Sequence, residues 1–278
     1  MGHSVIPEAE AVLDKEFPVL DKGFVRLVDY MGSDDRIVQS ARVSYGSGTK
    51  SFREDKGLIN YLLRNEHTSP FEQVVFTFHT KMPIFVARQW VRHRTARVNE
   101  ISGRYSVMKN EFYLPAEEDV AFQSLDNKQG RSEEDIPAEL KQKVRSLLEE
   151  EQNRVYENYT SLLEDNVARE LARINLPLSL YTEWYWQMDL KNMFHFLKLR
   201  MDAHAQMEIR VYAEAIHKLV SKVCPIAMEA FDNHINGSVR FSAAELDALN
   251  KVMAGEENPL KGRDLDRFEA KLKDHKQL

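Results

Sequence analysis

Two stretches in which polar and apolar side chains alternate constrain the fold of this 278-residue chain more than any other feature. In residues 74–81, Val74, Phe76 and Phe78 lie on one face and Thr77, His79 and Lys81 on the other. In residues 180–186, Leu180, Thr182, Trp184 and Trp186 alternate with Tyr181, Glu183 and Tyr185. Such alternation predicts half-buried strands. Apolar residues at helical spacing occupy much of the remaining chain. We therefore expect an α+β fold in which a mostly antiparallel sheet is packed by long helices.

The expected elements divide into a main domain, residues 1–235, and a C-terminal extension of unknown role, residues 236–278. In the main domain we expect a further strand at residues 24–28 and helices over residues 35–43, 52–65, 84–94, 137–174, 190–201 and 204–223. In the extension we expect weakly amphipathic stretches at residues 244–253 and 264–272.

Local signals position several of these helices. Asp34 and Asp189 are candidate caps for the helices that follow them. Pro177 is expected to stop the long helix that starts near residue 137. The inward stripe of helix 52–65 is expected to consist of Leu58, Tyr61 and Leu62.

The composition is that of an ordinary soluble protein, with 38 Lys and Arg against 44 Asp and Glu. Neither a secretory leader nor an apolar run of about 20 residues is found, so we expect a cytoplasmic protein without a membrane partner. The acidic balance argues against a surface that follows nucleic acid, so no nucleic-acid partner is expected. Residues 116–135 hold seven acidic and two basic side chains and are expected to form a solvated surface loop.

Cysteine and histidine usage limits the chemistry. Cys224 is the single cysteine, which excludes an intramolecular disulfide framework and a cysteine-based zinc site within one chain. It lies in apolar surroundings and is expected to be a packed side chain. The nine histidines lack the close spacing of a metal-binding pair, so no metal is expected.

Residues 88–106 form a block with five arginines, one glutamate and no lysine inside this acidic chain. A guanidinium group binds phosphate through two parallel hydrogen bonds and stays charged when it loses water. We expect Gln89, Arg92 and His93 to share one face of a helix. Gly103 is expected to form a turn where backbone N–H groups approach an anion. The block therefore predicts an anion site.

The same residues carry a family signature. Arg92-His93-Arg94, followed after seven residues by Ser102, resembles the RHR-x7-S motif of the flavin-dependent thymidylate synthases, the ThyX family. The resemblance covers roughly residues 20 to 235. The flanking segments follow in the family's order: His67 with residues 69–72, residues 99–106, and residues 197–200 with residues 204–206.

This resemblance implies an enzyme that converts dUMP to dTMP. The carbon would come from 5,10-methylenetetrahydrofolate and the electrons from NADPH, with FAD as the bound cofactor. Such enzymes are homotetramers whose active sites are shared between identical subunits. The lone cysteine lies outside every matched segment, which favours the flavin route over the unrelated thymidylate synthases that use a cysteine nucleophile.

The resemblance also implies functional residues, each at the position of this sequence that matches the family's motif. Those implied for the flavin are Ser44, Ser69, Glu72, Arg92, His93, Arg94, Asp189, Lys191, His195 and Leu199. Those implied for dUMP are Gln89, Arg92, Glu100, Ile101, Ser102, Gly103, Arg104, Arg173 and Arg200. Three of the flavin positions depart from the residues that are usual in the family, namely Asp189, Lys191 and His195.

Three residues are implied in the chemistry itself. Arg200 would lie near the pyrimidine carbonyl, where it can stabilise enolate-like charge. His67 would lie near the flavin ring and the folate. We expect Ser102 to donate or accept hydrogen bonds, since no base that could activate it as a nucleophile neighbours it in the sequence.

Two alternatives remain open from the residues alone. The first is an RNA- or DNA-binding protein that uses the arginine-rich helix, with Trp90 and Tyr105 as stacking platforms. The second is a flavin- or nucleotide-binding protein that has lost the chemistry. A flavin absorbance band separates the main hypothesis from the first alternative, and turnover of dUMP separates it from the second.

Overall fold

An antiparallel sheet forms the centre of the fold. The computed structural model describes residues 5–43, 52–125, 130–132 and 134–274. The strands, in the order in which they lie side by side, are β1 (Glu16–Val19), β2 (Gly23–Met31), β3 (Val75–Pro83), β5 (Tyr181–Asp189) and β4 (Arg97–Glu100). Neighbouring strands are antiparallel throughout, and Phe78 of β3 lies opposite Trp186 of β5. The predicted α+β fold and the three predicted strands are confirmed.

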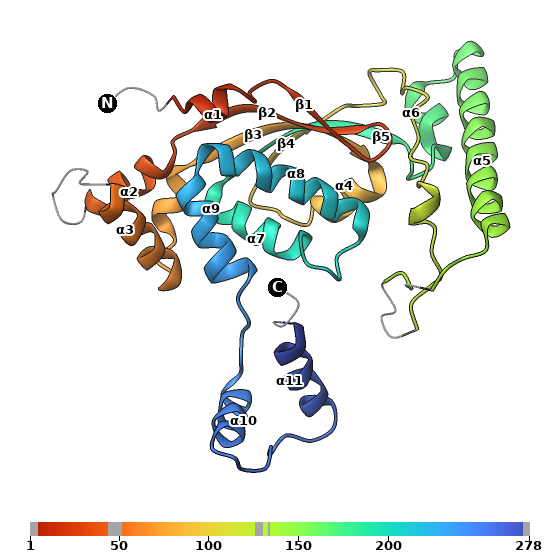
Figure 1. The fold of residues 1–278 in the computed structure, drawn as a ribbon. Coiled ribbons are helices and arrows are strands. Elements are labelled where there is room, and N and C mark those ends of the chain that lie inside the picture. Colours follow the sequence, from red (N-terminus) through yellow and green to blue (C-terminus); the bar gives the residue numbers. More distant parts are fainter. Residues whose placement is uncertain (1–4, 44–51, 126–129, 133, 275–278) are drawn as a thin grey trace. The chain divides into compact units, whose positions relative to one another are not determined.

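Helices cover one face of this sheet (Figure 1). The helices nearest to it are α4 (Ile84–Trp90), α7 (Leu190–Arg200) and α8 (Met207–Val223), and α9 (Pro225–Phe231) packs against α8. The others in this part of the chain are α1 (Pro7–Glu10), α2 (Asp34–Arg42), α3 (Phe52–Arg64), α5 (Ala138–Glu164), α6 (Arg169–Ala172) and the short 3₁₀ helices η2 (Ser69–Gln73), η3 (Glu117–Asp119) and η4 (Arg173–Asn175).

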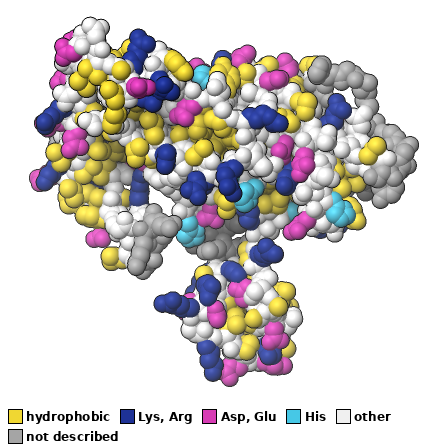
Figure 2. Space-filling view, turned by 180° about the vertical axis from the view of Figure 1, so that it is seen from behind, with side chains coloured by type: hydrophobic (Ala, Val, Ile, Leu, Met, Phe, Trp, Pro, Cys, Tyr) yellow, Lys and Arg dark blue, Asp and Glu magenta, His cyan; other side chains and the backbone are white. Residues whose placement is uncertain are grey.

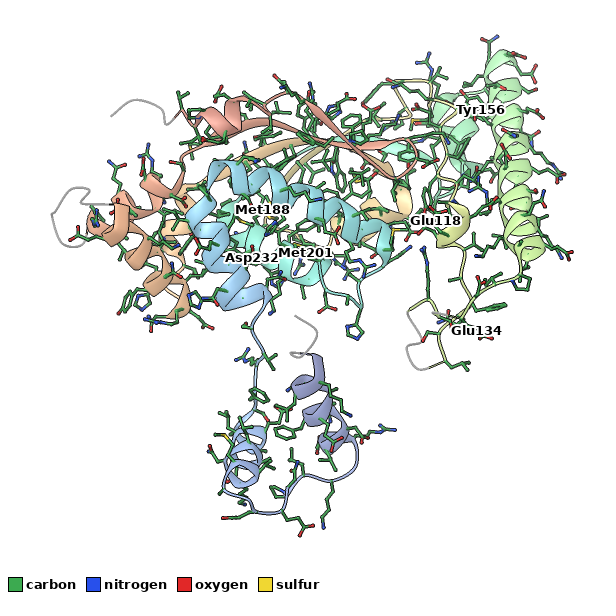
Figure 3. All side chains as sticks on the ribbon, viewed as in Figure 1. Glu118, Glu134, Tyr156, Met188, Met201 and Asp232 are labelled. Carbon is green, nitrogen blue, oxygen red and sulfur yellow. The ribbon has the colours of Figure 1, made fainter. Side chains whose placement is uncertain are left out.

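The core between sheet and helices is largely aromatic. The Trp90 ring lies 5.2 Å from that of Trp186 and 5.0 Å from that of Phe196, and all three side chains are buried. Met188, near the end of β5, is buried in the same layer (Figure 3). Each such burial contributes about 1.5–3 kcal/mol to stability. The end of α4 is therefore fixed against both β5 and α7.

The helix predicted over residues 84–94 is too long. Helix α4 ends at Trp90, which enters the core, and the chain then turns into β4 at Arg97. The prediction that Gln89, Arg92 and His93 share a helix face is therefore wrong. Helical spacing in residues 91–94 was misleading because β4 pairs with β5 and draws the chain away from the helix axis.

The long helix is also shorter than predicted. Helix α5 ends at Glu164 rather than near Pro177, because Asn166 adopts a left-handed conformation with φ of 58°. The N–H of Val167 then donates to the carbonyl of Leu162, which closes the helix end. Helix α6 follows after the turn.

Helix α5 packs through a second, smaller cluster. Tyr156 projects from α5 (Figure 3), and its hydroxyl donates to the Met108 carbonyl. The hydroxyl of Tyr159, also on α5, accepts from the Met108 N–H. Phe112, Ala172 and Leu180 complete the buried centre of this cluster. The segment that follows the arginine block is thereby held on α5.

Two local predictions at α2 and α3 are wrong in detail. Asp34 is the first residue of α2 rather than its cap, and its carboxylate accepts from the N–H groups of Ile226 and Ala227 at the start of α9. Burial raises its pKa to about 6. On α3, Tyr61 is 48% exposed, and the buried residues are Ile59, Leu62 and Leu63, so the inward face is rotated from the predicted stripe. Asp189, by contrast, caps α7 as predicted.

The acidic segment is anchored more firmly than a solvated loop would be. Arg131 bonds to the carboxylate of Glu208, a buried residue in the first turn of α8. The hydroxyl of Tyr113 donates to the same carboxylate over 3.1 Å. Glu117, Glu118 and Arg131 are exposed, as expected of a surface segment, but Arg131 also pairs with Glu208, because a buried carboxylate requires a cationic partner.

The chain divides into two compact units, residues 1–231 and 232–278. The second unit contains a π-helical turn (Asp232–Asn236), α10 (Ala243–Met253) and α11 (Arg263–Asp274). Phe268 is its buried centre, and a capping box of Ser242 and Glu245 starts α10. Within the described residues no helix is long and apolar enough to span a membrane.

Candidate active site

The site begins where α4 and α7 meet. Trp90 stacks on Phe196 in the core, and the His93 ring meets the same phenylalanine edge-on, with the ring centres 5.0 Å apart. Arg200 lies one turn further along α7, at its last residue. This packing brings together two residues, His93 and Arg200, that are far apart in the sequence.

Arg200 is held by two hydrogen bonds. Its Nε donates to Nε2 of His93 over 3.0 Å, and its Nη2 donates to the backbone carbonyl of Gln89 over 3.2 Å. Burial lowers the pKa of His93 to about 4, and the positive charge of Arg200 and the nearby His195 act in the same direction. His93 is therefore a neutral acceptor at pH 7. The Gln89 side chain in turn bonds to that of Gln206, next to the start of α8.

The arginines of the block differ in their partners. Arg88, Arg92, Arg94 and Arg97 are exposed, and none of them forms an ion pair with any residue in the described part of the chain. Arg104 forms one with Glu170 over 3.2 Å, between two half-exposed side chains. On the face shown in Figure 2, Lys and Arg side chains gather beside histidines near the middle of the larger unit. Unpaired guanidinium groups in a chain with net charge −6 are suited to phosphate.

The predicted flavin residues follow one face of α7. Lys191, His195 and Leu199 are spaced four residues apart, so they lie on the same side of the helix. At one end, Lys191 pairs with Glu72 of η2 over 3.7 Å. In the middle, the His195 ring lies 5.8 Å from that of His93. This face therefore connects η2 with the arginine block.

A cavity of about 1140 Å³ lies between α2, α3 and η2. His67 and Ser69 line it together with Arg42, and the His67 ring meets that of Tyr61 at 5.8 Å. Two of the predicted site residues therefore share one cavity. Ser44, the remaining flavin prediction, lies outside the described residues.

Several predicted nucleotide residues lie at the end of β4 and in the turn that follows it. The Glu100 carboxylate accepts from the Thr182 hydroxyl over 2.6 Å, and the Ser102 hydroxyl accepts from the Arg104 N–H over 3.3 Å. A Cβ on Gly103 would stand 3.0 Å from Cδ of Arg173. Glycine thus lets the turn approach Arg173. Ile101 is held by its N–H, which donates to the carbonyl of Glu183.

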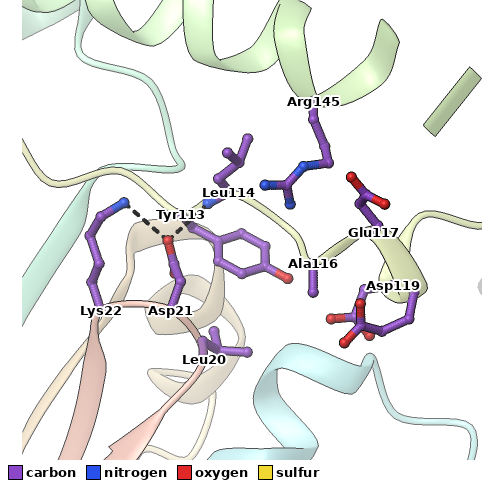
Figure 4. Close-up of a pocket in the computed structure, with 10 residues that line it drawn as sticks. Leu20, Asp21, Lys22, Tyr113, Leu114, Ala116, Glu117, Asp119 and Arg145 are labelled. Atoms are coloured by element: carbon purple, nitrogen blue, oxygen red, sulfur yellow. Dashed lines mark hydrogen bonds and ion pairs between the residues drawn. The ribbon is translucent and has the colours of Figure 1, made fainter. Parts of the chain in front are cut away.

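Other parts of the molecule contain different polar groups. Cys224 is fully buried, and burial raises the pKa of its thiol, which keeps it from acting as a thiolate nucleophile. A cavity of about 640 Å³ beside the Asp21–Lys22 ion pair contains Tyr113 and Arg145 but none of the predicted site residues (Figure 4). In the described part of the chain, no cluster of His, Cys, Asp and Glu side chains is suited to a metal ion.

One polar network was not anticipated from the sequence. On the sheet, His79 bonds through Nδ1 to Arg26 and through Nε2 to Glu183, and its ring stacks on Tyr185 at 4.8 Å. Burial and the charge of Arg26 lower the pKa of His79. Only the strand register reveals this network, because it places the three strands side by side.

Comparison with known proteins identifies the family. A family model described as thymidylate synthase complementing protein matches residues 26–226, and one described as thymidylate synthase ThyX C-terminal domain matches residues 239–278. The flavin-dependent thymidylate synthase of Treponema denticola is 64% identical over 266 residues, which cover 96% of this chain and 100% of that protein. That of Treponema pallidum is 57% identical over 273 residues, covering 98% of this chain and 90% of that protein.

Two solved structures are also similar to this chain. The UMP/dUMP methylase PolB from Streptomyces cacaoi bound with 5-Br UMP has 32% sequence identity and a TM-score of 0.70, and covers 78% of this chain and 96% of its own. Its structure bound with 5-Br dUMP has a TM-score of 0.68. The fold thus matches that of a nucleotide methylase. The chain belongs to the flavin-dependent thymidylate synthase family, an enzyme family, and the resemblance seen in the sequence is confirmed.

Proposed function

We propose that this enzyme converts dUMP to dTMP, with 5,10-methylenetetrahydrofolate as carbon donor, NADPH as reductant and FAD as cofactor. The observation that carries the proposal is the Arg200 guanidinium, held by two neutral acceptors, Gln89 and His93, that belong to the same arginine-rich segment as the unpaired arginines. Such a group keeps its full charge for an anionic or enolate-like ligand. A cytoplasmic location stays a prediction.

The donor set on α7 and in the arginine block fits FAD. Arg92 and Arg94 offer guanidinium groups without partners among the described residues, and Lys191 adds an ammonium group. We assign FAD to Ser44, Ser69, Glu72, Arg92, His93, Arg94, Asp189, Lys191, His195 and Leu199. When bound, FAD supplies the redox chemistry, and these residues supply position and charge.

We assign dUMP to the turn after β4 and to the arginines around it. The residues are Gln89, Arg92, Glu100, Ile101, Ser102, Gly103, Arg104, Arg173 and Arg200. Arg200 would donate to the pyrimidine carbonyl and stabilise the negative charge that develops there when C5 attacks the one-carbon unit. Ser102 would act through hydrogen bonds, since its hydroxyl accepts from the backbone N–H of Arg104 and does not meet a base in the described part of the chain.

His67 would lie close to the flavin ring and the folate. Its place beside Ser69 on the wall of the 1140 Å³ cavity supports this role, because a cavity of that size accommodates an aromatic ligand. The exposed His67 side chain would contact the ligand directly.

We further propose a homotetramer with active sites shared between identical subunits. Leu171, Ile174 and Leu178 are 57%, 68% and 60% exposed and flank Arg173, a proposed nucleotide residue. Large apolar side chains at such a position are suited to burial against another copy. Sedimentation equilibrium should give four times the chain mass of 32.3 kDa, and a monomer at micromolar concentration would contradict this assembly.

Two measurements test the reaction. Purified protein should show a flavin absorbance band after incubation with FAD, and should release tritium from 5-³H-dUMP when NADPH and methylenetetrahydrofolate are present. A protein that takes up no FAD would contradict the proposal. A flavoprotein that binds dUMP without releasing tritium would instead support the alternative in which the chemistry has been lost.

A further inference from the structure

The two hydrogen bonds on Arg200 determine which edge of its guanidinium group remains available. A guanidinium carries five N–H donors in one plane. The described contacts use two of them, Nε–H toward His93 and one Nη2–H toward the Gln89 carbonyl. Because the group is planar, holding it at two points fixes both its plane and its direction. Three donors remain for a ligand.

Both acceptors are neutral, and this distinguishes Arg200 from an arginine in an ion pair. A carboxylate in the place of His93 would hold the guanidinium equally well but would cancel much of its charge. Arginine stays protonated, so His93 can accept only if its Nε2 carries no proton, and the ring proton must lie on Nδ1. The low pKa of His93, caused mainly by burial, keeps the ring in this form at pH 7.

The His93 ring is itself fixed by its surroundings. It is 8% exposed, and its edge-on contact with Phe196 ties it to the aromatic core. The side-chain bond between Gln89 and Gln206 steadies the second acceptor, because it links the end of α4 to the start of α8. The position of Arg200 thus depends on core packing rather than on an exposed loop.

We propose that His93 is a positioning residue, a neutral hydrogen-bond acceptor that aims the Arg200 guanidinium at the pyrimidine carbonyl of dUMP without neutralising its charge. This rests on the proposed function, in which Arg200 contacts the pyrimidine. His93 would then contribute to dUMP binding and turnover through Arg200, separately from any contact that it makes with FAD.

Two substitutions of His93 distinguish the roles of its two ring nitrogen atoms. In His93→Gln, the Oε1 atom can take the place of Nε2 and still accept from Arg200, whereas in His93→Asn the shorter side chain places its oxygen near the position of Nδ1. At saturating FAD, verified by the absorbance ratio of flavin to protein, we expect His93→Asn to raise the Kd of dUMP about tenfold, the loss typical of one hydrogen bond to a charged group. His93→Gln should stay within about threefold of the parent protein.

A double-mutant cycle tests whether the effect runs through Arg200. In an Arg200→Ala background, His93→Asn should cause no further loss of dUMP affinity, because the group that it positions is gone. Equal losses in both backgrounds would overturn the proposal, as would a His93→Gln protein that binds dUMP no better than His93→Asn. Thermal unfolding of each variant serves as the control for folding.

The tautomer of His93 can be measured without dUMP, which tests this proposal independently of the reaction. Long-range ¹H–¹⁵N spectra of histidine-labelled protein should show the His93 proton on Nδ1, with a change in the ring signals in Arg200→Ala. A proton on Nε2 would overturn the proposal. Absence of tritium release from a protein with the Nδ1 tautomer would instead contradict the proposed function alone.

Discussion

At the scale of single residues, the environment of His93 governs the candidate site. The ring is buried beside a permanent cation, so protonation would place two positive charges 3.0 Å apart in a partly dry setting. Both burial and charge oppose protonation, which is why the pKa of His93 falls to about 4. Histidine is useful here for its acceptor nitrogen rather than for its proton.

The depressed pKa makes the stability of the protein depend on pH. The unfolded chain binds a proton at His93 below about pH 6.5, whereas the folded chain resists until about pH 4. Protons therefore favour the unfolded state in this window, and the contribution of His93 to stability is present above pH 6.5 and is lost as the pH falls toward 4. Urea unfolding of the parent and His93→Gln should diverge across that window. Parallel pH profiles would contradict the prediction.

Arg200 allows flavin binding and substrate chemistry to be separated. We expect Arg200→Ala to keep its FAD and to lose dUMP turnover by about two orders of magnitude or more, as is typical when a donor to a developing oxyanion is removed. Flavin absorbance and tritium release measure the two effects on the same sample. The neighbouring exposed Lys198→Ala is the matched control and should keep its turnover. Unchanged turnover in Arg200→Ala would remove the role assigned to Arg200.

At the scale of elements, helix ends are determined by contacts that local spacing does not report. Helix α4 ends where Trp90 enters the core, and α5 ends at the left-handed Asn166. Asp34 caps not its own helix but α9, almost two hundred residues later. The end of α4 sets the path of the arginine block, and the end of α5 sets the position of η4, which contains Arg173. The Asp34 cap determines how the chain continues after α8.

The link between α2 and α9 can be tested directly. Asp34→Ala leaves the Ile226 and Ala227 N–H groups without their acceptor, so the free energy of unfolding should fall by about 1–3 kcal/mol. Asp34→Asn retains one acceptor oxygen and should lose less. Asp35→Ala, at an exposed neighbouring position, should change stability by about 0.5 kcal/mol or less. Equal losses in Asp34→Ala and Asp35→Ala would show that the buried link contributes nothing.

At the scale of the whole molecule, the chain combines two units with separate cores. The larger unit, residues 1–231, contains the sheet and the candidate site, and the smaller one, residues 232–278, closes around Phe268. Opposite charges are also separated along the chain. The acidic residues 116–135 and the arginine block lie in different segments, so the net charge of −6 conceals a local positive site.

A core substitution in the smaller unit should unfold it selectively. Phe268 is 1% exposed, and replacement by alanine costs about 3–5 kcal/mol, more than a unit of this size can supply. Limited proteolysis of Phe268→Ala should therefore cut within residues 232–278 and leave residues 1–231 resistant. Met253→Ala, at a 78% exposed position in the same unit, should behave like the parent protein. A parent-like digest of Phe268→Ala would contradict the prediction.

The sequence by itself determined three of the five strands and the family, and it proposed the candidate residues. Alternation in residues 74–81 and the RHR-x7-S motif are local patterns, and they can be read without knowing which segments meet. The cap at Asp189 was equally readable, because its partner, Asn192, lies three residues away. What these cases share is short separation along the chain.

The tertiary structure alone decided which residues meet. His93 and Arg200 are 107 residues apart, and only the packing of Trp90 on Phe196 brings the imidazole to the guanidinium. The same packing lowers the pKa of His93, because burial and a neighbouring cation are properties of the folded chain. The sequence could therefore name both residues, but hydrogen bonding and desolvation act through space, and their outcome appears only when the chain is folded.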